Sequence, residues 1–236
     1  GLTATPIRKD GHHPIIFMQC GPIRHHIHAR QATAKRPFFH NVIPRETEFA
    51  LLTKDPLIHD IYGKMVHDSP RNRQIVSDIV STVKAGLTPL VLTERVEHLE
   101  ALASLLREKI DTVIVLKGSM KRGERDAARS ALSVGDGNMP RIIIATGRYI
   151  GEGFDYSRLD ALFLAMPISW RGTLEQYVGR LHRLHEGKRE VRVYDYVDHN
   201  VPMLASMFAK RLRGYRAMGY SIQDASRQLM LSSVET

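Results

Sequence analysis

The sequence predicts an α/β fold in which one parallel sheet is covered by helices on both faces. From residue 88 onward, short apolar segments alternate with longer segments that repeat apolar residues every three or four positions. The apolar segments are continuous, as expected of strands that are buried on both faces. With 236 residues, the chain can form one such domain and additional segments around it.

Five strands and three helices are expected in this regular part of the chain. Each apolar segment has the length of a strand, and each helical segment is longer and carries an apolar stripe. A glycine-rich turn follows the third strand at 147–155. We expect strands at 89–93, 112–118, 141–146, 159–167 and 189–197, and helices at 95–110, 121–132 and 173–185.

The flanking residues are less regular. Residues 36–49 contain a proline within an extended pattern, which favours an edge strand or a linker. A helix is expected from Asn72 to Ala85, with Gly86 at its end. Residues 202–221 predict an amphipathic helix that packs its apolar stripe on the domain, with a nucleic-acid contact as the alternative. Its basic residues are expected to stay in water: Lys210, Arg211, Arg213 and Arg216.

Composition excludes several classes of protein. No run of 18 apolar residues is present and the first ten residues lack the apolar core of a signal peptide, so we expect no membrane partner. The single cysteine, Cys20, excludes an internal disulfide and fits a reducing, cytoplasmic location. A net charge of +9 favours a polyanionic partner, although basic surfaces are common on other proteins.

The segment QYVGRLHR at 176–183 raises a chemical question. In a helix, Gln176, Arg180 and Arg183 would share one face, while the apolar residues would lie on the neighbouring face. Two aligned guanidinium groups repel each other unless an anion lies between them. The alternative is a solvated polar face without a ligand.

Three segments resemble, in order and spacing, motifs of the superfamily 2 helicases and translocases. LTATP at 2–6 resembles the coupling motif S/T-A-T. ATGRYIGEGFD at 145–155 resembles the motif T…G-x-D of the second motor domain, and 176–183 resembles Q-x-x-G-R-x-x-R. PLVLTERVEHLEAL at 89–102 is similar to the first strand and helix of that domain. The chain looks closest to DEAD/DEAH-type helicases allied to type III restriction subunits and excision-repair translocases.

The resemblance implies a RecA-like domain of the P-loop NTPase fold that has no P-loop of its own. No G-x-x-x-x-G-K-[ST] is present, and neither Gly63-Lys64 nor Gly187-Lys188 has the required neighbours. No Asp-Glu pair is available for a Mg²⁺-binding box. In this family both features belong to the first RecA-like lobe, so we expect the printed sequence to begin where that lobe ends.

The expected domain boundaries follow from this comparison. They are a stub of the first lobe with a connector at 1–35, a linker with an edge strand and a helix at 36–73, the second RecA-like domain at 74–200, and a helical extension at 201–236.

By resemblance, ATP with Mg²⁺ binds between the two lobes of the intact protein, and neither is expected on this chain alone. Arg183 is the first choice for the arginine finger, with Arg180 beside it. Gln176 matches the glutamine near the γ-phosphate and the attacking water. Gly179 would leave room for the opposite lobe.

The glycine-rich turn follows a buried strand, where α/β sheets place ligands. By resemblance, Gly153 and Asp155 lie on the nucleotide side. Thr146 and Gly147 would offer a hydroxyl and a backbone N–H to a nucleic-acid phosphate. The alternative is a tight turn that needs glycines for its geometry alone.

Further residues match the family's nucleic-acid path. Thr3 and Thr5 belong to the coupling motif. Thr93 and Arg95 follow the first strand, where free N–H groups suit a phosphate, although Thr93 could instead cap the next helix. The other predicted contacts with the nucleic-acid backbone are Lys117 and Gly118, for which an ordinary polar loop is the alternative.

The twelve histidines do not form a recognisable metal pattern. His182 is expected to be a packing or hydrogen-bonding residue rather than a base. Trp170 could stack on a base or cap the domain edge.

These observations favour the C-terminal motor domain of an ATP-dependent helicase or translocase that acts on nucleic acid, DNA more than RNA, together with its own N-terminal lobe. A RecA-like nucleic-acid scaffold without motor action is the alternative, and a dinucleotide-dependent enzyme is disfavoured because G-x-G-x-x-G is absent. The chain alone should not hydrolyse ATP.

Overall fold

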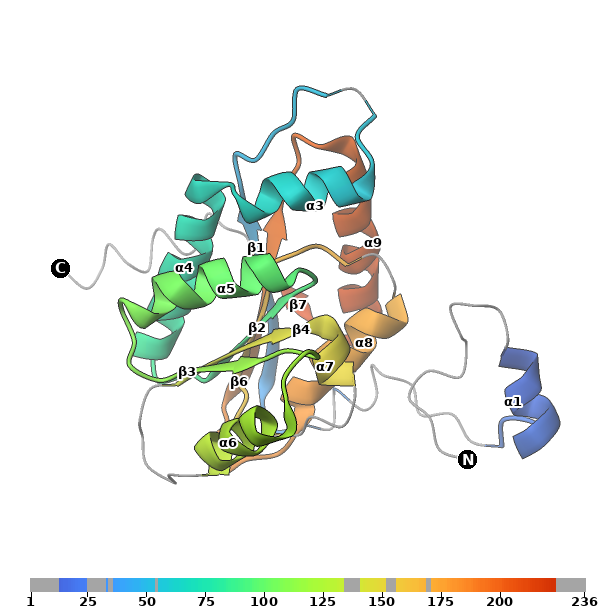
Figure 1. Ribbon diagram of the computed structural model, residues 1–236. Coiled ribbons are helices and arrows are strands. Elements are labelled where there is room, and N and C mark those ends of the chain that lie inside the picture. Colours follow the sequence, from blue (N-terminus) through green and yellow to red (C-terminus); the bar gives the residue numbers. More distant parts are fainter. Residues whose placement is uncertain are drawn as a thin grey trace.

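The computed structural model describes residues 13–24, 33, 36–53, 55–133, 141–151, 156–168 and 171–223 (Figure 1). Seven strands form one sheet in the order β3-β4-β2-β5-β6-β1-β7, and every neighbouring pair is parallel. The predicted α/β fold with a parallel sheet is therefore confirmed. The strands are β1 (Phe39–Glu46), β2 (Pro89–Thr93), β3 (Val113–Leu116), β4 (Ile142–Thr146), β5 (Ala161–Leu164), β6 (Glu190–Val197) and β7 (Ser221–Ile222).

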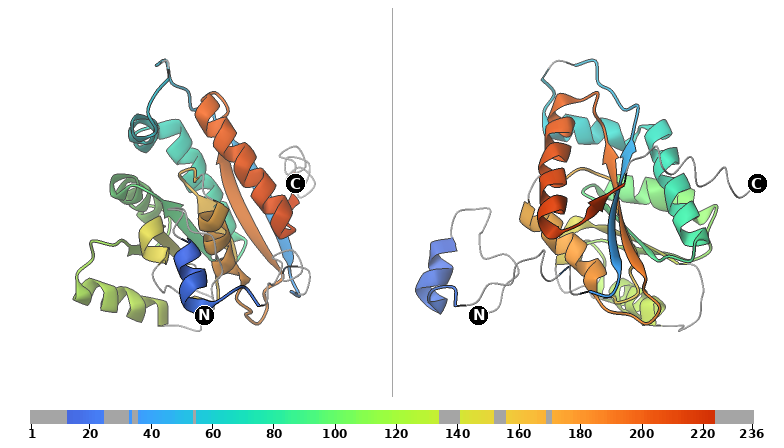
Figure 2. Two further views of the ribbon diagram at one scale, coloured as in Figure 1. Left: turned by 90° about the vertical axis from the view of Figure 1, so that its right-hand side faces the viewer. Right: turned by 180° about the vertical axis from the view of Figure 1, so that it is seen from behind.

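Helices cover both faces of the sheet (Figure 2). The described helices are α1 (His13–Cys20), α3 (Ile58–Val66), α4 (Ser69–Lys84), α5 (Val96–Arg107), α6 (Arg122–Ser133), α7 (Gly147–Gly151), α8 (Arg171–Gly179), the 3₁₀ turn η1 (Arg180–His182) and α9 (Pro202–Met218). None of the helices in these described ranges combines the length and apolar character needed to cross a membrane.

The strands divide their side chains between two hydrophobic cores. Val91 packs with α4 and α5 on one face, whereas Leu90 and Leu92 pack with α7, α8 and α9 on the other. This division follows from the strand geometry, because successive side chains point to opposite faces. Continuous apolar segments are required where both faces are covered, as the sequence indicated.

Strand β1 belongs to the same sheet although it lies well before residue 74. It pairs with β6 along its whole length, and β7 pairs with it only at Asn41 and Val42. Pro44 lies beyond that short pairing, where the missing N–H costs no second ladder bond. The edge-strand pattern seen in the sequence therefore applies to the second half of β1.

The expected continuous helix at 173–185 is wrong. Helix α8 ends at Gly179, η1 follows, and Arg183 has an extended backbone with φ −67° and ψ 133°. Gln176, Arg180 and Arg183 therefore do not share one face of a single helix. Glycine is a poor helix former, and the tighter 3₁₀ turn is a common way to end a helix.

Helix α9 confirms the predicted C-terminal helix with one correction. It ends at Gly219, whose φ of 83° is the left-handed conformation of a helix C-cap. Lys210, Arg213 and Arg216 are exposed, but Arg211 is buried. The expectation that all four basic residues stay in water is therefore wrong for Arg211.

Candidate functional site

Turn η1 places Arg180 beside helix α7, and Arg183 directly follows η1. The Nη2 of Arg180 donates a hydrogen bond of 3.0 Å to the carbonyl of Ile150 in α7. The Nε of Arg180 is buried and has no hydrogen-bond partner within the described part of the chain. Gln176 and Arg183 are exposed. Arg180 therefore contacts helix α7, which directly follows β4.

Gly147 lies at a tight junction between α7, α8 and the end of β2. A Cβ added to Gly147 would overlap the Tyr177 hydroxyl and lie 2.7 Å from Glu94 Oε1. Tyr177 hydrogen-bonds to Glu94, and burial followed by the charge of Glu94 raises the pKa of Tyr177. The protonated hydroxyl therefore donates to the carboxylate, and only glycine fits beneath this pair.

The Thr93 side chain is hydrogen-bonded to a buried histidine, His98. His98 Nε2 lies 2.8 Å from Asn72 Oδ1, and its Nδ1 lies 3.0 Å from the Thr93 hydroxyl. Asn72 uses its amide nitrogen to donate to the Val66 carbonyl, so its Oδ1 accepts and His98 carries its proton on Nε2. The Thr93 hydroxyl then donates to His98 Nδ1. Thr93 as a whole residue is only 2% exposed. Thr93 therefore directs its side chain inward.

The other predicted nucleic-acid residues lie at the carboxyl ends of three adjacent strands. Thr146 ends β4 and is paired with Thr93 in the sheet register, and Lys117 follows β3 on the other side of β4. Thr146 is buried, whereas Gly118 and Arg95 are exposed. The structure thus brings these residues to one edge, with the two threonine side chains turned away from solvent.

The charges on this edge already have protein partners. Lys117 Nζ lies 2.7 Å from Glu100 Oε1, and that hydrogen bond, with the carboxylate charge, raises the pKa of Lys117. The Arg95 guanidinium donates to the His59 carbonyl at 3.3 Å. Both contacts are at the surface, where an ion pair contributes little and can be exchanged for another anion.

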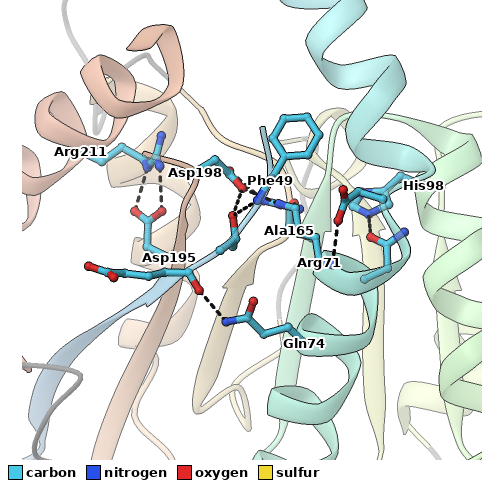
Figure 3. Close-up of polar contacts among 12 residues, drawn as sticks. Phe49, Arg71, Gln74, His98, Ala165, Asp195, Asp198 and Arg211 are labelled. Atoms are coloured by element: carbon cyan, nitrogen blue, oxygen red, sulfur yellow. Dashed lines mark hydrogen bonds and ion pairs between the residues drawn. The ribbon is translucent and has the colours of Figure 1, made fainter. Parts of the chain in front are cut away.

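Two buried ion pairs near the end of β6 stabilise this framework (Figure 3). Arg211 Nε and Nη2 each donate to Asp195 at 2.8 Å, and Tyr215 donates to the same carboxylate. Arg71 donates to Asp198 at 2.7 Å and 3.2 Å. Sequence reasoning missed both pairs, although two acidic residues within the apolar segment VYDYVD were a usable signal.

His182 has the packing and hydrogen-bonding position that the sequence predicts. Its Nε2 lies 2.7 Å from the Tyr220 hydroxyl, and burial lowers the pKa of His182 to about 3, helped by the nearby Arg36 charge. The imidazole is therefore neutral. Within the described ranges, no three histidine, cysteine or acidic side chains are grouped as metal ligands.

Some predicted residues fall outside the described ranges. These are Thr3, Thr5, Gly153, Asp155 and Trp170. Gly179 is exposed, and a Cβ built there would meet no atom within 4 Å.

The residues that build this site lie largely within a match to a known protein family. The family model of the helicase conserved C-terminal domain matches residues 72–185, which include the arginine segment and the turn after β4. Residues 72–185 are a helicase C-terminal domain of superfamily 2. This family assignment confirms the resemblance seen in the motifs.

A curated relative supports the helicase assignment over part of its length. The chain is 23% identical over 133 residues to "Probable helicase D10" of Escherichia phage T5, which covers 56% of this chain and 29% of that protein. The chain thus spans less than a third of this relative.

Solved structures share the helicase fold. A fragment of an HsdR subunit of a type I restriction enzyme from Vibrio vulnificus YJ016 has a TM-score of 0.70 at 19% identity, covering 95% of this chain and 43% of that one. UvsW of T4 has a TM-score of 0.62 at 20% identity, covering 79% and 41%. At these identities the likeness shows the RecA-like fold alone.

Proposed function

We propose that this helicase domain is the second motor lobe of an ATP-dependent helicase or translocase, and that it supplies Arg180 and Arg183 to ATP held by an N-terminal RecA-like lobe. The buried Nε of Arg180 carries this proposal, because no described residue accepts its hydrogen bond. A buried cationic N–H without an acceptor is costly. A shift of this guanidinium toward a phosphate oxygen brought by a second lobe would give the Nε its acceptor and remove that cost.

The arginine segment fits a transferring phosphoryl group. Arg180 is anchored to α7 through Ile150, so its guanidinium has a defined position before any ligand binds. Arg183 is exposed beside it, and both place positive charge where negative charge develops during transfer. Bound ATP with Mg²⁺ would supply the γ-phosphoryl group that passes to water. Gln176, one helical turn before Arg180, would orient that water.

Two further positions are consistent with a facing lobe. Gly179 is exposed with open space around its Cα, so the approaching surface meets no side chain there. Gly153 and Asp155 would lie on the nucleotide side by the motif resemblance. Closing of the two lobes on ATP and their opening after hydrolysis would move the protein along the strand.

The nucleic-acid backbone would follow the carboxyl ends of β3, β4 and β2. Exposed Gly118 and Arg95, together with the partly exposed Lys117, would contact phosphates, since the present contacts of Lys117 and Arg95 are exchangeable. Thr93 and Thr146 are buried and would act by holding the strand ends in place. DNA is the first choice because the motif resemblance is to type III restriction subunits and excision-repair translocases.

ATP hydrolysis by the full-length protein tests the proposal. Arg183→Ala should lower kcat by about 10³-fold or more, while the affinity for a non-hydrolysable ATP analogue stays within a few fold. Arg107→Ala is the matched control, because Arg107 is exposed at the end of α5 on the opposite face of the sheet. A full rate for Arg183→Ala would refute the finger assignment.

A further inference from the structure

Lys188 makes an unusual set of contacts just after the arginine segment. Its Nζ lies 2.8 Å from the carbonyl oxygens of Leu159 and Arg183, and 3.0 Å from those of Ser157 and Leu181. An ammonium has three N–H donors, so four carbonyls share three hydrogen bonds. Burial lowers the pKa of Lys188, and the charge of Asp160 opposes that effect.

The chain turns back on itself to bring this ammonium under Arg183. Gly187 has a φ of 83°, and the Lys188 N–H donates to the His185 carbonyl at 3.2 Å. Only glycine adopts such a φ without strain, so the turn at 185–188 is specified by the sequence. The ammonium also makes a cation–π contact with a distant part of the chain, because Nζ lies 5.6 Å from the centre of the Phe38 ring.

Two of the contacted carbonyls lie just after helix α8, where no helical N–H is available to them. Helix α8 has ended, and Arg183 is extended, so the carbonyls of Leu181 and Arg183 cannot be satisfied by continuing a helix. Lys188 supplies the missing donors. The same ammonium reaches the carbonyls of Ser157 and Leu159, which directly precede β5.

We propose that Lys188 is a positioning residue for the arginine finger: its ammonium fixes the backbone of Arg183 and joins it to the segment 157–159 that leads into β5. This inference rests on the proposed function of Arg183. Immobilising a half-buried lysine costs side-chain entropy and desolvation. Hydrogen bonds to carbonyls of two separate segments, 157–159 and 181–183, fix the geometry of Arg183 in return. Displacement of a catalytic group by about 1 Å can lower a rate by about 10²-fold.

The sequence shows Lys188 only as the second residue of a Gly-Lys pair that is not a P-loop. Its role becomes visible from the fold, because Ser157 and Leu159 are about thirty residues away along the chain. A cleft of about 660 Å³, lined by Lys84, Arg158, Asp160 and Lys188 among others, opens beside it. This cleft is large enough to admit a small amine next to residue 188.

The test uses the full-length protein and three variants. Lys188→Met keeps the aliphatic stem beside Phe38 and removes the donors, Lys188→Ala removes both, and Lys84→Ala is the control from the same cleft. We expect kcat for ATP hydrolysis to fall by about 10-fold to 10²-fold in both Lys188 variants, with the affinity for a non-hydrolysable ATP analogue unchanged. Lys84→Ala should match the wild type.

Two readouts separate positioning from a general structural role. Ethylammonium or propylammonium should restore part of the kcat of Lys188→Ala and none of that of Arg183→Ala. In the double variant Arg183→Ala/Lys188→Ala, the loss should equal that of Arg183→Ala alone, because the lysine acts through the arginine.

The outcomes distinguish this inference from the proposed function. Full hydrolysis by Arg183→Ala would refute the finger itself. A low rate for Arg183→Ala with a wild-type rate for Lys188→Met would overturn only the positioning role. Additive losses in the double variant, or failure of both Lys188 variants to fold, would also overturn it, because Lys188 would then support the domain as a whole.

Discussion

Two pairs of arginines in this domain have different surroundings. Arg71 and Arg211 are buried near the end of β6, and each faces a carboxylate with two hydrogen bonds. Arg180 instead donates to a neutral carbonyl and keeps a buried Nε without an acceptor among the described residues, and Arg183 is exposed. The first pair has its charge matched by carboxylates within the fold, whereas the second is the pair that we propose binds the phosphates of ATP.

The contrast shows how one residue type can be assigned to structure or to function. A buried guanidinium with a two-fold carboxylate partner has its charge and its donors matched internally. A guanidinium that is held at one nitrogen and unmatched at another is preorganised for a ligand. The burial of an arginine and the chemistry of its partners together decide whether its role is structural or functional, and neither can be read from the sequence alone.

The largest expected effect on stability is at the structural pair. Asp195→Asn leaves the Arg211 charge buried without a carboxylate, and breaking such a pair costs about 3–5 kcal/mol. We expect this loss in the free energy of unfolding measured with urea. Asp126→Asn, on the exposed surface of α6, should change it by less than about 0.5 kcal/mol. Equal stability of the two variants would show that the β6 pairs are not required.

A smaller loss of stability is expected at Gly147, in the tight junction between α7, α8 and the end of β2. Gly147→Ala forces the Tyr177 hydroxyl and Glu94 apart, and overpacking of this kind costs about 1–3 kcal/mol. The matched variant Gly179→Ala has open space at its Cβ and should be neutral or slightly stabilising, since Gly179 lies at the end of a helix. Thermal melting of both proteins measures the difference, and a stable Gly147→Ala would contradict the tight junction.

Acidification should lower the stability of the folded protein through His98, the neutral histidine that hydrogen-bonds to Thr93. Burial, aided by the charge of Arg71, lowers the pKa of His98 to about 3, against about 6.5 when unfolded. Between these values the unfolded chain binds a proton and the folded protein does not, so stability falls as the pH drops below about 6.5. The loss from pH 7 to pH 5 is about 2 kcal/mol for this residue.

Unfolding at both pH values checks this expectation. His98→Gln removes the titrating group and should reduce the pH dependence by about that amount, whereas His199→Gln, at an exposed position, serves as the control. An unchanged pH dependence in His98→Gln would mean that His98 binds a proton equally well in the folded and unfolded states.

The smallest change in stability is expected at Arg180. Arg180→Met loses one hydrogen bond to a carbonyl and also removes an N–H that is buried without an acceptor, so the two effects offset each other. We expect a change within about 1 kcal/mol, whereas Arg211→Met should lose several times more because Asp195 is left buried. A large loss in Arg180→Met would place Arg180 with the structural pair.

The sequence predicted the elements of the fold well because their signals are local. Continuous apolar segments specified buried parallel strands, and apolar periodicity specified α5 and α9. The end of α8 at Gly179 was missed because the pattern of Leu181 and Leu184 continues the helical period, while the backbone is determined by distant partners. Lys188, for example, draws the carbonyls of Leu181 and Arg183 toward Ser157 and Leu159.

The candidate site was predicted at the level of motifs and missed at the level of partners. Spacing identified Gln176, Arg180 and Arg183, but it could not show that the Thr93 side chain points to His98 or that Arg211 is buried against Asp195. Such pairings join residues from separate elements, so they depend on sheet order and register rather than on neighbouring letters.

The most direct measurement is single-turnover ATP hydrolysis by the full-length protein with nucleic acid present. The account predicts that Arg183→Ala binds ATP with near wild-type affinity and hydrolyses it about 10³-fold or more slowly, while Arg107→Ala is unaffected. Hydrolysis by Arg183→Ala at the wild-type rate would contradict the claim that this domain completes the catalytic site of a second lobe.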